Sequence, residues 1–321
     1  MRRIIIKKAF YLIGMLFLIS LISFFAIHLA PNSFLAAGQL NPNITKETIE
    51  HLKAVYGLDK PLWQQYLSWL WAMLHLDFGV SFASGKPVID EIAERIGITL
   101  GINLSAMVLI FVLAFYLGIK SAMRQDSLFD RIVKNISLIS FSMPSFYLAL
   151  LLILFLSVQL HFFPIAGLHS LEPKKGLAYY LDVAWHLVLP IFVVVFVGFG
   201  SLVQYIRSLT LEILKSDYIF FAKARNIGDK DLVKYFIIPN LKPPIITMLG
   251  LSLPGIIGGS VILESIFSIN GMGLLFYQAA MARDYPVIMG ILIITAFLTL
   301  LGNILADLAL LWLNPYARRQ S

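Results

Sequence analysis

The stretch ITLGINLSAMVLIFVLAFYLGI, residues 98–119, decides the fold because it holds 22 residues without a charged side chain. A hydrocarbon core about 30 Å thick is crossed by about 20 mostly apolar residues in a helix. The backbone has to be helical there, because hydrocarbon offers no partner to unpaired peptide groups. The stretch therefore predicts a membrane-spanning helix.

Five other runs share this apolar character. The chain is 59% hydrophobic and 13% charged, with a mean hydropathy of +0.83, which is typical of an integral membrane protein rather than a soluble domain. It contains no cysteine, which excludes disulfides and thiolate metal sites. We expect an all-α integral membrane protein with six transmembrane helices near residues 9–30, 98–120, 134–160, 185–206, 243–263 and 287–312.

The first apolar run follows four basic residues, as the core of a signal peptide would. It continues to Ala30, however, which is longer than such a core, and it ends in HLAPN (28–32) without a small-x-small cleavage site. We therefore expect a retained helix.

The basic residues give the orientation. With the N-terminus inside, the inner segments hold 17 Lys and Arg residues, while the short outer loops hold only Lys174, Lys175 and Arg283. This bias places both termini in the cytoplasm. The net charge of +7 is therefore attributed to basic cytoplasmic loops, and it does not indicate binding to nucleic acid.

The spans divide the chain into four parts. Residues 1–30 are a cytoplasmic N-terminus and the first span, and residues 31–97 are an extracytoplasmic loop with short helices near 45–57 and from Pro61. Trp63, Trp69 and Trp71 predict that the second of these lies at the membrane interface, although a packed loop helix is an equal alternative. Residues 98–313 form a core of five spans with a cytoplasmic loop over 207–242, and residues 314–321 are a cytoplasmic tail.

The cytoplasmic loop contains a charged stretch, SDYIFFAKARNIGDKDLVKYF (216–236), between two apolar spans. We expect the fourth span to continue through it as an amphipathic helix, with Leu211, Leu214, Tyr218, Phe221 and Ala222 on one face. Asn226 and Gly228 favour a left-handed turn, Asp229 is suited to cap a second short helix, and that helix is expected to end at the sequence IPN (238–240).

Phe220 and Phe221 favour a protein partner for this loop, because exposed aromatic side chains gain from an apolar surface. A solvated hairpin without a partner is the alternative.

The loop resembles the EAA loop of permease subunits in binding-protein-dependent ABC importers. Ala222 and Pro239 match the general pattern, Ile238 is a conservative replacement, and the pattern's Glu and Gly are absent. In the dipeptide, oligopeptide and nickel branch the loop reads D-Y-x-x-x-A-x-A-x-G. Asp217, Tyr218, Ala222 and Ala224 fit that version, and Asn226 replaces its Gly.

The resemblance to the first permease of this branch extends nearly end to end. It is carried by YGLDKPLWQQYLSWL (56–70), LDFGVSFASGKPVIDEIAERI (76–96), ISFSMPSFYLALLLILF (139–155), FFPIAG (162–167), IPNLKPPIITMLG (238–250) and ESIFSINGMGLLFYQAAMARDYPVIMG (264–290).

The resemblance implies a type I permease fold in the bacterial inner (plasma) membrane, forming half of a peptide pathway that works by alternating access. Nickel or a metal chelate is the alternative cargo. The implied partners are a second homologous permease, two cytoplasmic ATPase subunits that bind ATP and Mg²⁺, and an extracytoplasmic substrate-binding protein. This chain would itself hold no cofactor and catalyse nothing.

The resemblance also implies two functional segments. The ATPase-docking residues would be Asp217, Tyr218, Phe220, Phe221, Ala222, Ala224, Arg225, Asn226, Gly228, Asp229 and Pro239. A gating loop on the outer side would contain Glu264, Gly271, Gly273, Arg283 and Asp284.

Other motifs carry no catalytic chemistry. ASGKP (83–87) lacks the spacing and the Ser or Thr of a phosphate-binding loop, and NGMG (270–273) is no dinucleotide fingerprint. The six histidines form no ligand pair, so we expect no metal site. No catalytic pair within the spans supports an intramembrane enzyme, and a secondary transporter is the second rival.

Five polar residues fall within or near the predicted spans: Asn103, Gln204, Arg207, Asn303 and Asp307. A charged group at mid-membrane costs about 2.5–3.5 kcal/mol on insertion scales, so each needs a partner or a water-filled path. We expect hydrogen bonds between helices more often than contacts with cargo.

Overall fold

The computed structural model describes residues 2–29, 60–172 and 174–313. Within these ranges the regular elements are helices, and one isolated β-bridge joins Val80 to Pro87. The expected all-α architecture is confirmed. The helix expected near residues 45–57 lies outside the described residues.

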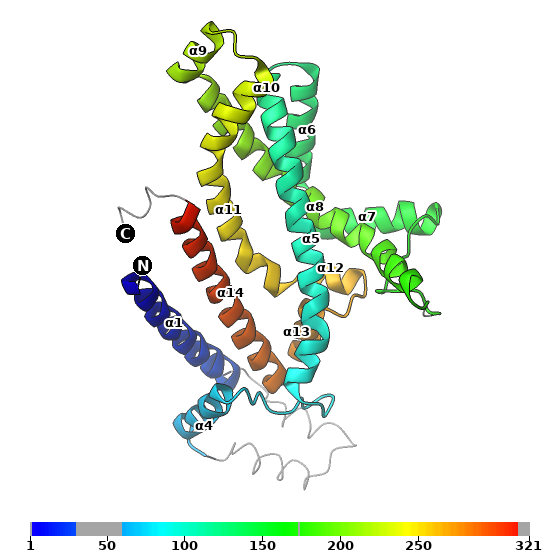
Figure 1. Cartoon of the computed structure of the whole chain (residues 1–321). Coiled ribbons are helices and arrows are strands. Elements are labelled where there is room, and N and C mark those ends of the chain that lie inside the picture. Colours follow the sequence, from blue (N-terminus) through cyan, green and yellow to red (C-terminus); the bar gives the residue numbers. More distant parts are fainter. Residues whose placement is uncertain (1, 30–59, 173, 314–321) are drawn as a thin grey trace. The chain divides into compact units, whose positions relative to one another are not determined.

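The helices follow one another along the chain (Figure 1). Their bounds are α1 Arg2–Leu29, α4 Leu62–Leu74, α5 Val88–Met123, α6 Leu128–Ser142, α7 Ser145–Leu152, α8 Leu177–Leu214, α9 Asp217–Ala224, α10 Asp229–Leu232, α11 Ile238–Gly258, α12 Val261–Ile266, α13 Met272–Ala282 and α14 Tyr285–Leu313. Two π-helical stretches, η1 (Ile153–Gln159) and η2 (Val233–Ile237), extend α7 and precede α11.

Three described helices are long and apolar enough to cross a membrane: α5, α8, and α14 over Tyr285–Leu305. A fourth span results if α6 and the α7–η1 pair are taken together. The described part of the chain therefore shows three or four spans by length and composition, and each of the six predicted segments contains helix.

The segment expected to span the membrane over 134–160 is not one continuous helix. α6 ends at Ser142 and α7 begins at Ser145, with a bend of 103° between the two parts. Pro144 has no N–H to continue a helix, and it restricts the residue before it to extended backbone. Met143 has this conformation, with φ −87° and ψ 124°.

The chain divides into two compact units, residues 1–97 with 271–301 and residues 98–270 with 302–321. In the first unit, the start of α5 packs on α13 and α14 through an apolar cluster that includes Val88, Ile92, Met272 and Val287. A second cluster joins α4 to α1, where the Tyr66 hydroxyl lies 2.9 Å from Ser20 Oγ and the Tyr66 ring contacts Phe24.

The α4 helix has two apolar faces. Tyr66, Trp69 and Leu70 pack towards Phe24, while the side chains of Trp63 and Trp71 are exposed. The helix expected from Pro61 onwards is therefore confirmed, with one face packed and the other free to meet an apolar environment.

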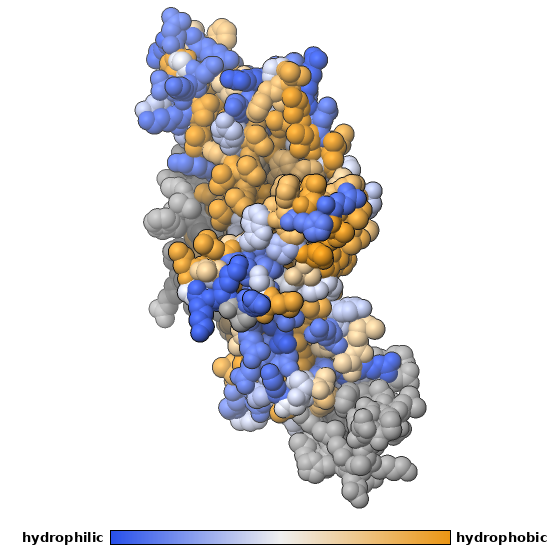
Figure 2. All heavy atoms as spheres, turned by 90° about the vertical axis from the view of Figure 1, so that its right-hand side faces the viewer, coloured by the Kyte–Doolittle hydropathy of each residue, from blue (hydrophilic) through white to orange (hydrophobic). Residues whose placement is uncertain are grey.

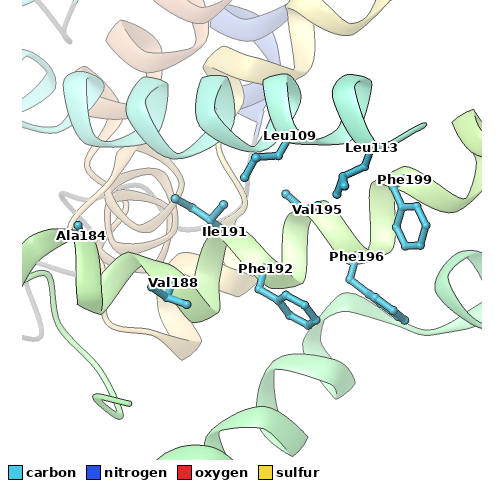
Figure 3. A pocket seen from close by; sticks show the side chains of 9 residues that line it. All are labelled: Leu109, Leu113, Ala184, Val188, Ile191, Phe192, Val195, Phe196 and Phe199. Carbon is cyan, nitrogen blue, oxygen red and sulfur yellow. The ribbon is translucent and has the colours of Figure 1, made fainter. Parts of the chain in front are cut away.

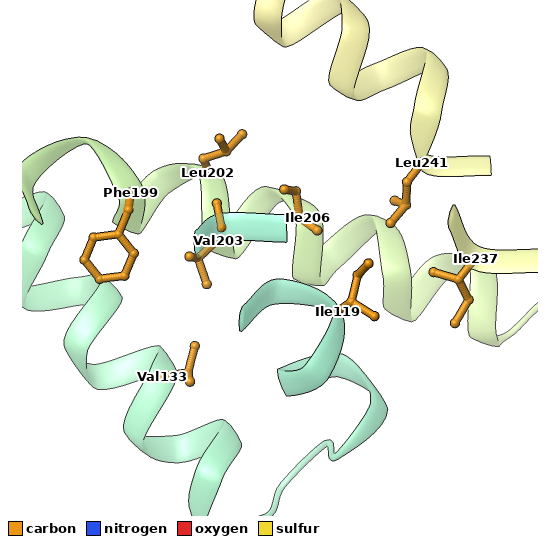
Figure 4. Packing of buried hydrophobic residues seen from close by; sticks show 9 residues of the cluster. Ile119, Val133, Phe199, Leu202, Val203, Ile206, Ile237 and Leu241 are labelled. Carbon is orange, nitrogen blue, oxygen red and sulfur yellow. The ribbon is translucent and has the colours of Figure 1, made fainter. Parts of the chain in front are cut away.

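In the second unit, α8 is the central helix and packs along α6 and against α5. The core contains Ile119 of α5, Val133 of α6, Val203 and Ile206 of α8, and Leu241 of α11 (Figure 4). Hydrophobic side chains predominate on the visible surface in the middle of this unit, and hydrophilic ones gather at the end that carries α9 and α10 (Figure 2). An apolar exterior next to a polar end is typical of a helix bundle that leaves the bilayer at that end.

Candidate functional site

The segment between α8 and α11 is a separate helical projection rather than a continuation of α8. α8 ends at Leu214, and the extended backbone of Ser216 (φ −74°, ψ 151°) precedes α9. The Ser216 hydroxyl donates to Ile213 O at 2.6 Å, a local bond by which serine competes with helical pairing. The continuous amphipathic helix predicted from the sequence is thus wrong.

The left-handed turn predicted at Asn226 is confirmed. Its φ is +59°, and its N–H donates to Lys223 O at 2.9 Å, while Ile227 N–H reaches back to Ala222 O at 3.2 Å. Such bonds close a helix whose next residue turns left-handed. Asparagine tolerates this conformation better than most residues with a Cβ.

Gly228, not Asp229, caps the second short helix. Gly228 O accepts from the N–H groups of Asp231 and Leu232, both at 3.0 Å, and Asp229 lies in the first turn. The prediction from the sequence therefore assigned this helix cap one residue too far along the chain. A carboxylate in the first turn still favours the helix through its dipole.

The interior of this segment consists of Ile219, Ala222 and Leu232, all buried. They pack against Ile213, Leu214, Ile227 and Phe236. The predicted face placed Tyr218 and Phe221 inside, but both are exposed, because the break at Ser216 restarts the helical register. Ile219 was missed for the same reason.

The exterior carries an aromatic pair. The side chains of Phe220 and Phe221 are 70% and 64% exposed, and their rings meet edge to face at 5.8 Å. The expected docking residues Asp217, Ala224 and Arg225 are exposed as well. Apart from the buried Ala222, this segment places its predicted docking side chains on its surface.

Pro239 does not end the second short helix, contrary to expectation. The chain passes from α10 through η2 into α11, and Pro239 lies in the first turn of α11. Proline is tolerated in a first helical turn, and the wider π-helical turn before it uses bonds five residues apart. The projection therefore continues into α11 without a break in the helical backbone.

The predicted gating residues fall in two places. In the second unit, Glu264 of α12 is buried and accepts a hydrogen bond from Thr99 Oγ1 of α5 at 3.1 Å. In the first unit, Gly271 caps α13, Gly273 is buried in its first turn, and Arg283 ends it in left-handed conformation with φ +57°. These residues lie in or next to the first or last turns of α12 and α13. Their role in gating stays a prediction.

Asp284 follows Arg283 and is buried. Its Oδ2 accepts from Ser81 Oγ at 2.5 Å and from Ala83 N–H at 3.0 Å. The loop that contains ASGKP thus wraps around a carboxylate of the α13–α14 junction.

Two of the five intramembrane polar candidates bond to neighbouring helices, as expected. Asn103 Nδ2 of α5 donates to Ile256 O of α11 at 2.8 Å. Arg207 of α8 forms two bonds to Asp130 of α6, Nε to Oδ1 at 2.7 Å and Nη2 to Oδ2 at 2.8 Å. Gln204 and Asn303 are half-buried on α8 and α14, and Asp307 is exposed on α14.

Asp130 was missed by sequence reasoning. It is fully buried at the start of α6 and also accepts from Ser121 Oγ and, at 3.0 Å, from Asp126 N–H. One signal could have drawn attention to it: two carboxylates, Asp126 and Asp130, lie between Arg124 and Lys134 in a stretch otherwise interpreted only as basic.

A pocket of about 440 Å³ lies between α5 and α8 (Figure 3). Leu109 and Leu113 of α5 line it together with Val188, Phe192 and Phe196 of α8, and every lining side chain is apolar. A peptide has termini and amides that need polar partners. This pocket therefore suits hydrocarbon rather than a peptide. Within the described ranges, no three His, Asp or Glu side chains could hold a metal ion together.

Comparison with known families completes this description. Residues 111–319 match the model of the family described as binding-protein-dependent transport system inner membrane component, and residues 1–103 match the model of the corresponding N-terminal region. The chain belongs to this family. The resemblance to permeases of binding-protein-dependent importers is therefore confirmed, as is the inner-membrane location.

Relatives of this permease align along nearly its whole length. The oligopeptide transport system permease protein AppB of Bacillus subtilis (strain 168) is 35% identical over 312 residues, which cover 97% of this chain and 98% of AppB. The dipeptide transport system permease protein DppB of Lactococcus lactis is 33% identical over 319 residues, covering 99% and 100%. DppB of Escherichia coli (strain K12) is 30% identical over 322 residues, covering 94% of each.

Family membership decides between the alternatives left by the sequence. An inner-membrane component of a binding-protein-dependent system is a transport subunit, which sets aside the secondary transporter and the intramembrane enzyme. Such a system includes a binding protein and an energy-supplying ATPase besides the permease.

Proposed function

We propose that this permease forms half of the pathway of an ATP-driven importer of di- and oligopeptides. Peptide cargo is supported by the names of the relatives, two of which are dipeptide permeases and one an oligopeptide permease. None of these three names mentions nickel, so the alternative cargo has no support from them.

In this proposal the chain crosses the membrane six times with both termini in the cytoplasm. It pairs with a second, homologous permease, two ATPase subunits bind ATP and Mg²⁺, and a binding protein delivers cargo to the outer side. The excess of basic residues in the inner segments supports the orientation.

The projection formed by α9, α10 and η2 is proposed to dock on an ATPase subunit. The observation that carries this proposal is the exposed pair Phe220 and Phe221, held on a buried base of Ile219, Ala222 and Leu232. A rigid base with an aromatic tip has the composition of interface anchors, which are rich in aromatic side chains. The tip supplies the contact, and the base transmits its movement.

The test replaces the tip without disturbing the base. In the double variant Phe220→Ser/Phe221→Ser, the permease should still insert into the membrane but should no longer purify with its ATPase subunits, and ATP-dependent peptide uptake should be lost. Ala222 is a poorer target, because its side chain is buried and a larger one would disrupt the base itself.

Tyr180→Ser is the matched control. Tyr180 is an equally exposed aromatic residue, but it lies in the first turn of α8, at the helix end away from α9. That variant should retain the ATPase and uptake. Wild-type levels of ATPase recovery and uptake in the Phe220/Phe221 variant would overturn the docking proposal.

Cargo is tested separately. The binding protein of the same system should retain peptides, and uptake of a labelled dipeptide by proteoliposomes should exceed uptake of ⁶³Ni²⁺ or its chelate. Selective uptake of nickel would overturn the peptide assignment while leaving the docking proposal intact.

A further inference from the structure

The Asp130 carboxylate joins three helices of the second unit. It receives the Ser121 hydroxyl from the last turn of α5, the Asp126 N–H from the α5–α6 turn, and both guanidinium bonds of Arg207 from α8. Lys134 approaches from the next turn of α6, with Nζ 3.6 Å from Oδ2. We call Asp130, Ser121 and Arg207 the polar node.

The node is buried and directional. Asp130 has no exposed surface, and the Arg207 side chain is only 12% exposed. A two-bond pair between a guanidinium and a carboxylate fixes the mutual orientation of its helices, whereas apolar contacts let them slide. Separating the pair would leave a buried charge without its partner, which is strongly unfavourable. α5, α6 and α8 are therefore held together as one body at this level.

Arg207 lies two helical turns before the end of α8, and the projection begins just after that end. The base residues Ile219 and Ala222 of α9 pack on Ile213 and Leu214 of α8. At the end of the projection that leads into α11, Ile237 of η2 and Leu241 of α11 pack in a core cluster (Figure 4). The same cluster contains Ile206, the neighbour of Arg207 on α8. Both ends of the projection, at α9 and at η2, therefore pack against α8, the helix that carries Arg207.

We infer that Asp130 and Arg207 are positioning residues that transmit movement of the docked projection to α5 and α6. The inference rests on the proposed function, since it requires an ATPase to move the projection. Apolar packing connects the projection to α8. The hydrogen bonds of the polar node then connect α8 to α5 and α6 with a fixed mutual orientation. Loss of the two-bond geometry lets α8 move without α5 and α6.

The principal variant is Arg207→Lys, which keeps the positive charge beside Asp130 but cannot make the two parallel bonds. The complex of this permease with its second permease and ATPases, reconstituted in proteoliposomes with the binding protein, is assayed for peptide uptake and ATP hydrolysis. We expect the Arg207→Lys complex to retain its ATPase subunits and to hydrolyse ATP, while peptide taken up per ATP falls at least about tenfold. Lys134→Ala, at the half-exposed edge of the node, is the matched control and should change this ratio less than about twofold.

A second measurement reads the movement directly. Because the chain contains no cysteine, a single Leu128→Cys substitution in the exposed first turn of α6 gives a unique label site beside Asp130. With an intact node, the rate of maleimide labelling should differ between the nucleotide-free complex and the complex trapped with ATP and vanadate. That difference should vanish with Arg207→Lys and persist with Lys134→Ala.

The outcomes separate the two proposals. If the wild-type complex recruits no ATPase, the proposed function itself is wrong. If Arg207→Lys recruits the ATPase and shows wild-type uptake per ATP or a wild-type labelling difference, only the role of the node is overturned. A nucleotide-free labelling rate equal to wild type shows that the variant is folded.

Discussion

The Ser81 hydroxyl donates to the Asp284 carboxylate at 2.5 Å across 203 residues of sequence. The bond holds the ASGKP loop on the α13–α14 junction, and the same carboxylate accepts from Ala83 N–H. The Ser81 hydroxyl and the Ala83 N–H therefore share one oxygen of a single buried side chain. The loop that lacks the spacing of a phosphate-binding loop instead binds a carboxylate of the protein itself.

Asp284→Ala should destabilise the first unit by about 1–3 kcal/mol, because it leaves the buried Ser81 hydroxyl and the partly buried Ala83 N–H without their acceptor. Ser81→Ala should cost less, about 1 kcal/mol, since Ala83 still binds the carboxylate. The thermal midpoint of the detergent-solubilised chain measures both. Asp77→Ala is the control, because Asp77 is exposed and accepts a local bond from the Gly79 N–H, two residues away. Equal midpoints for Asp284→Ala and Asp77→Ala would contradict the prediction.

Asn103→Leu should weaken the attachment of α11 to α5. Asn103 donates to Ile256 O, whose helical partner would be the N–H of Ser260, a residue beyond the end of α11. Leucine has the same branched shape and number of side-chain heavy atoms but no donor, so the Ile256 carbonyl loses this partner. Interhelical hydrogen bonds of this kind contribute about 0.6 kcal/mol on average and up to about 1.7 kcal/mol in membranes. Unfolding in mixed SDS micelles should show that the free energy of unfolding falls by an amount in this range. Asn135→Leu, at an exposed position on α6, should leave the free energy of unfolding unchanged.

Gly200→Ala tests the close contact of α6 with α8. A Cβ at Gly200 would lie 2.4 Å from Ser137 O and 2.6 Å from Ser140 Oγ, closer than any normal contact, so the helices must separate. Overpacking of this kind costs about 1–3 kcal/mol. Gly101→Ala on α5 meets nothing within 4 Å and should instead stabilise its helix by up to about 1 kcal/mol. Shifts of the thermal midpoint in opposite directions are expected, and a Gly200→Ala midpoint at or above wild type would exclude the steric argument.

Local features of the sequence predicted much of the fold. Apolar runs located the helices, and the tolerance of asparagine for left-handed backbone predicted the turn at Asn226. The bend at Pro144 was within reach of the same rules, but the uniform apolar run around it concealed the break. Length and apolarity alone do not show where a span changes direction.

Contacts between distant residues could not be predicted in this way. Arg207 was recognised as a polar residue needing a partner, yet its partner Asp130 lies 77 residues away, in a stretch interpreted as a basic loop. Ile219 was missed because one residue of extended backbone at Ser216 resets which side chains face inward. Charge patterns identify a side of the membrane, but pairing depends on how the helices pack.

Asn226 is the position where the local argument can be tested most directly. Its φ of +59° is open to glycine without strain and costs a residue with a Cβ about 1–2 kcal/mol, most for a β-branched one. Asn226→Gly should therefore preserve ATPase recovery and uptake, while Asn226→Val should loosen the turn between α9 and α10. Trypsin cleavage after the neighbouring Arg225 should then accelerate about fivefold or more. Cleavage proceeds through the locally unfolded turn, whose population rises about fivefold when its free energy of opening falls by about 1 kcal/mol. Ala224→Val is the matched control, because the same exposed valine then lies in the last turn of a right-handed helix and costs only about half a kcal/mol. Cleavage of Asn226→Val no faster than that of Ala224→Val would mean that the left-handed turn does not hold the projection in shape.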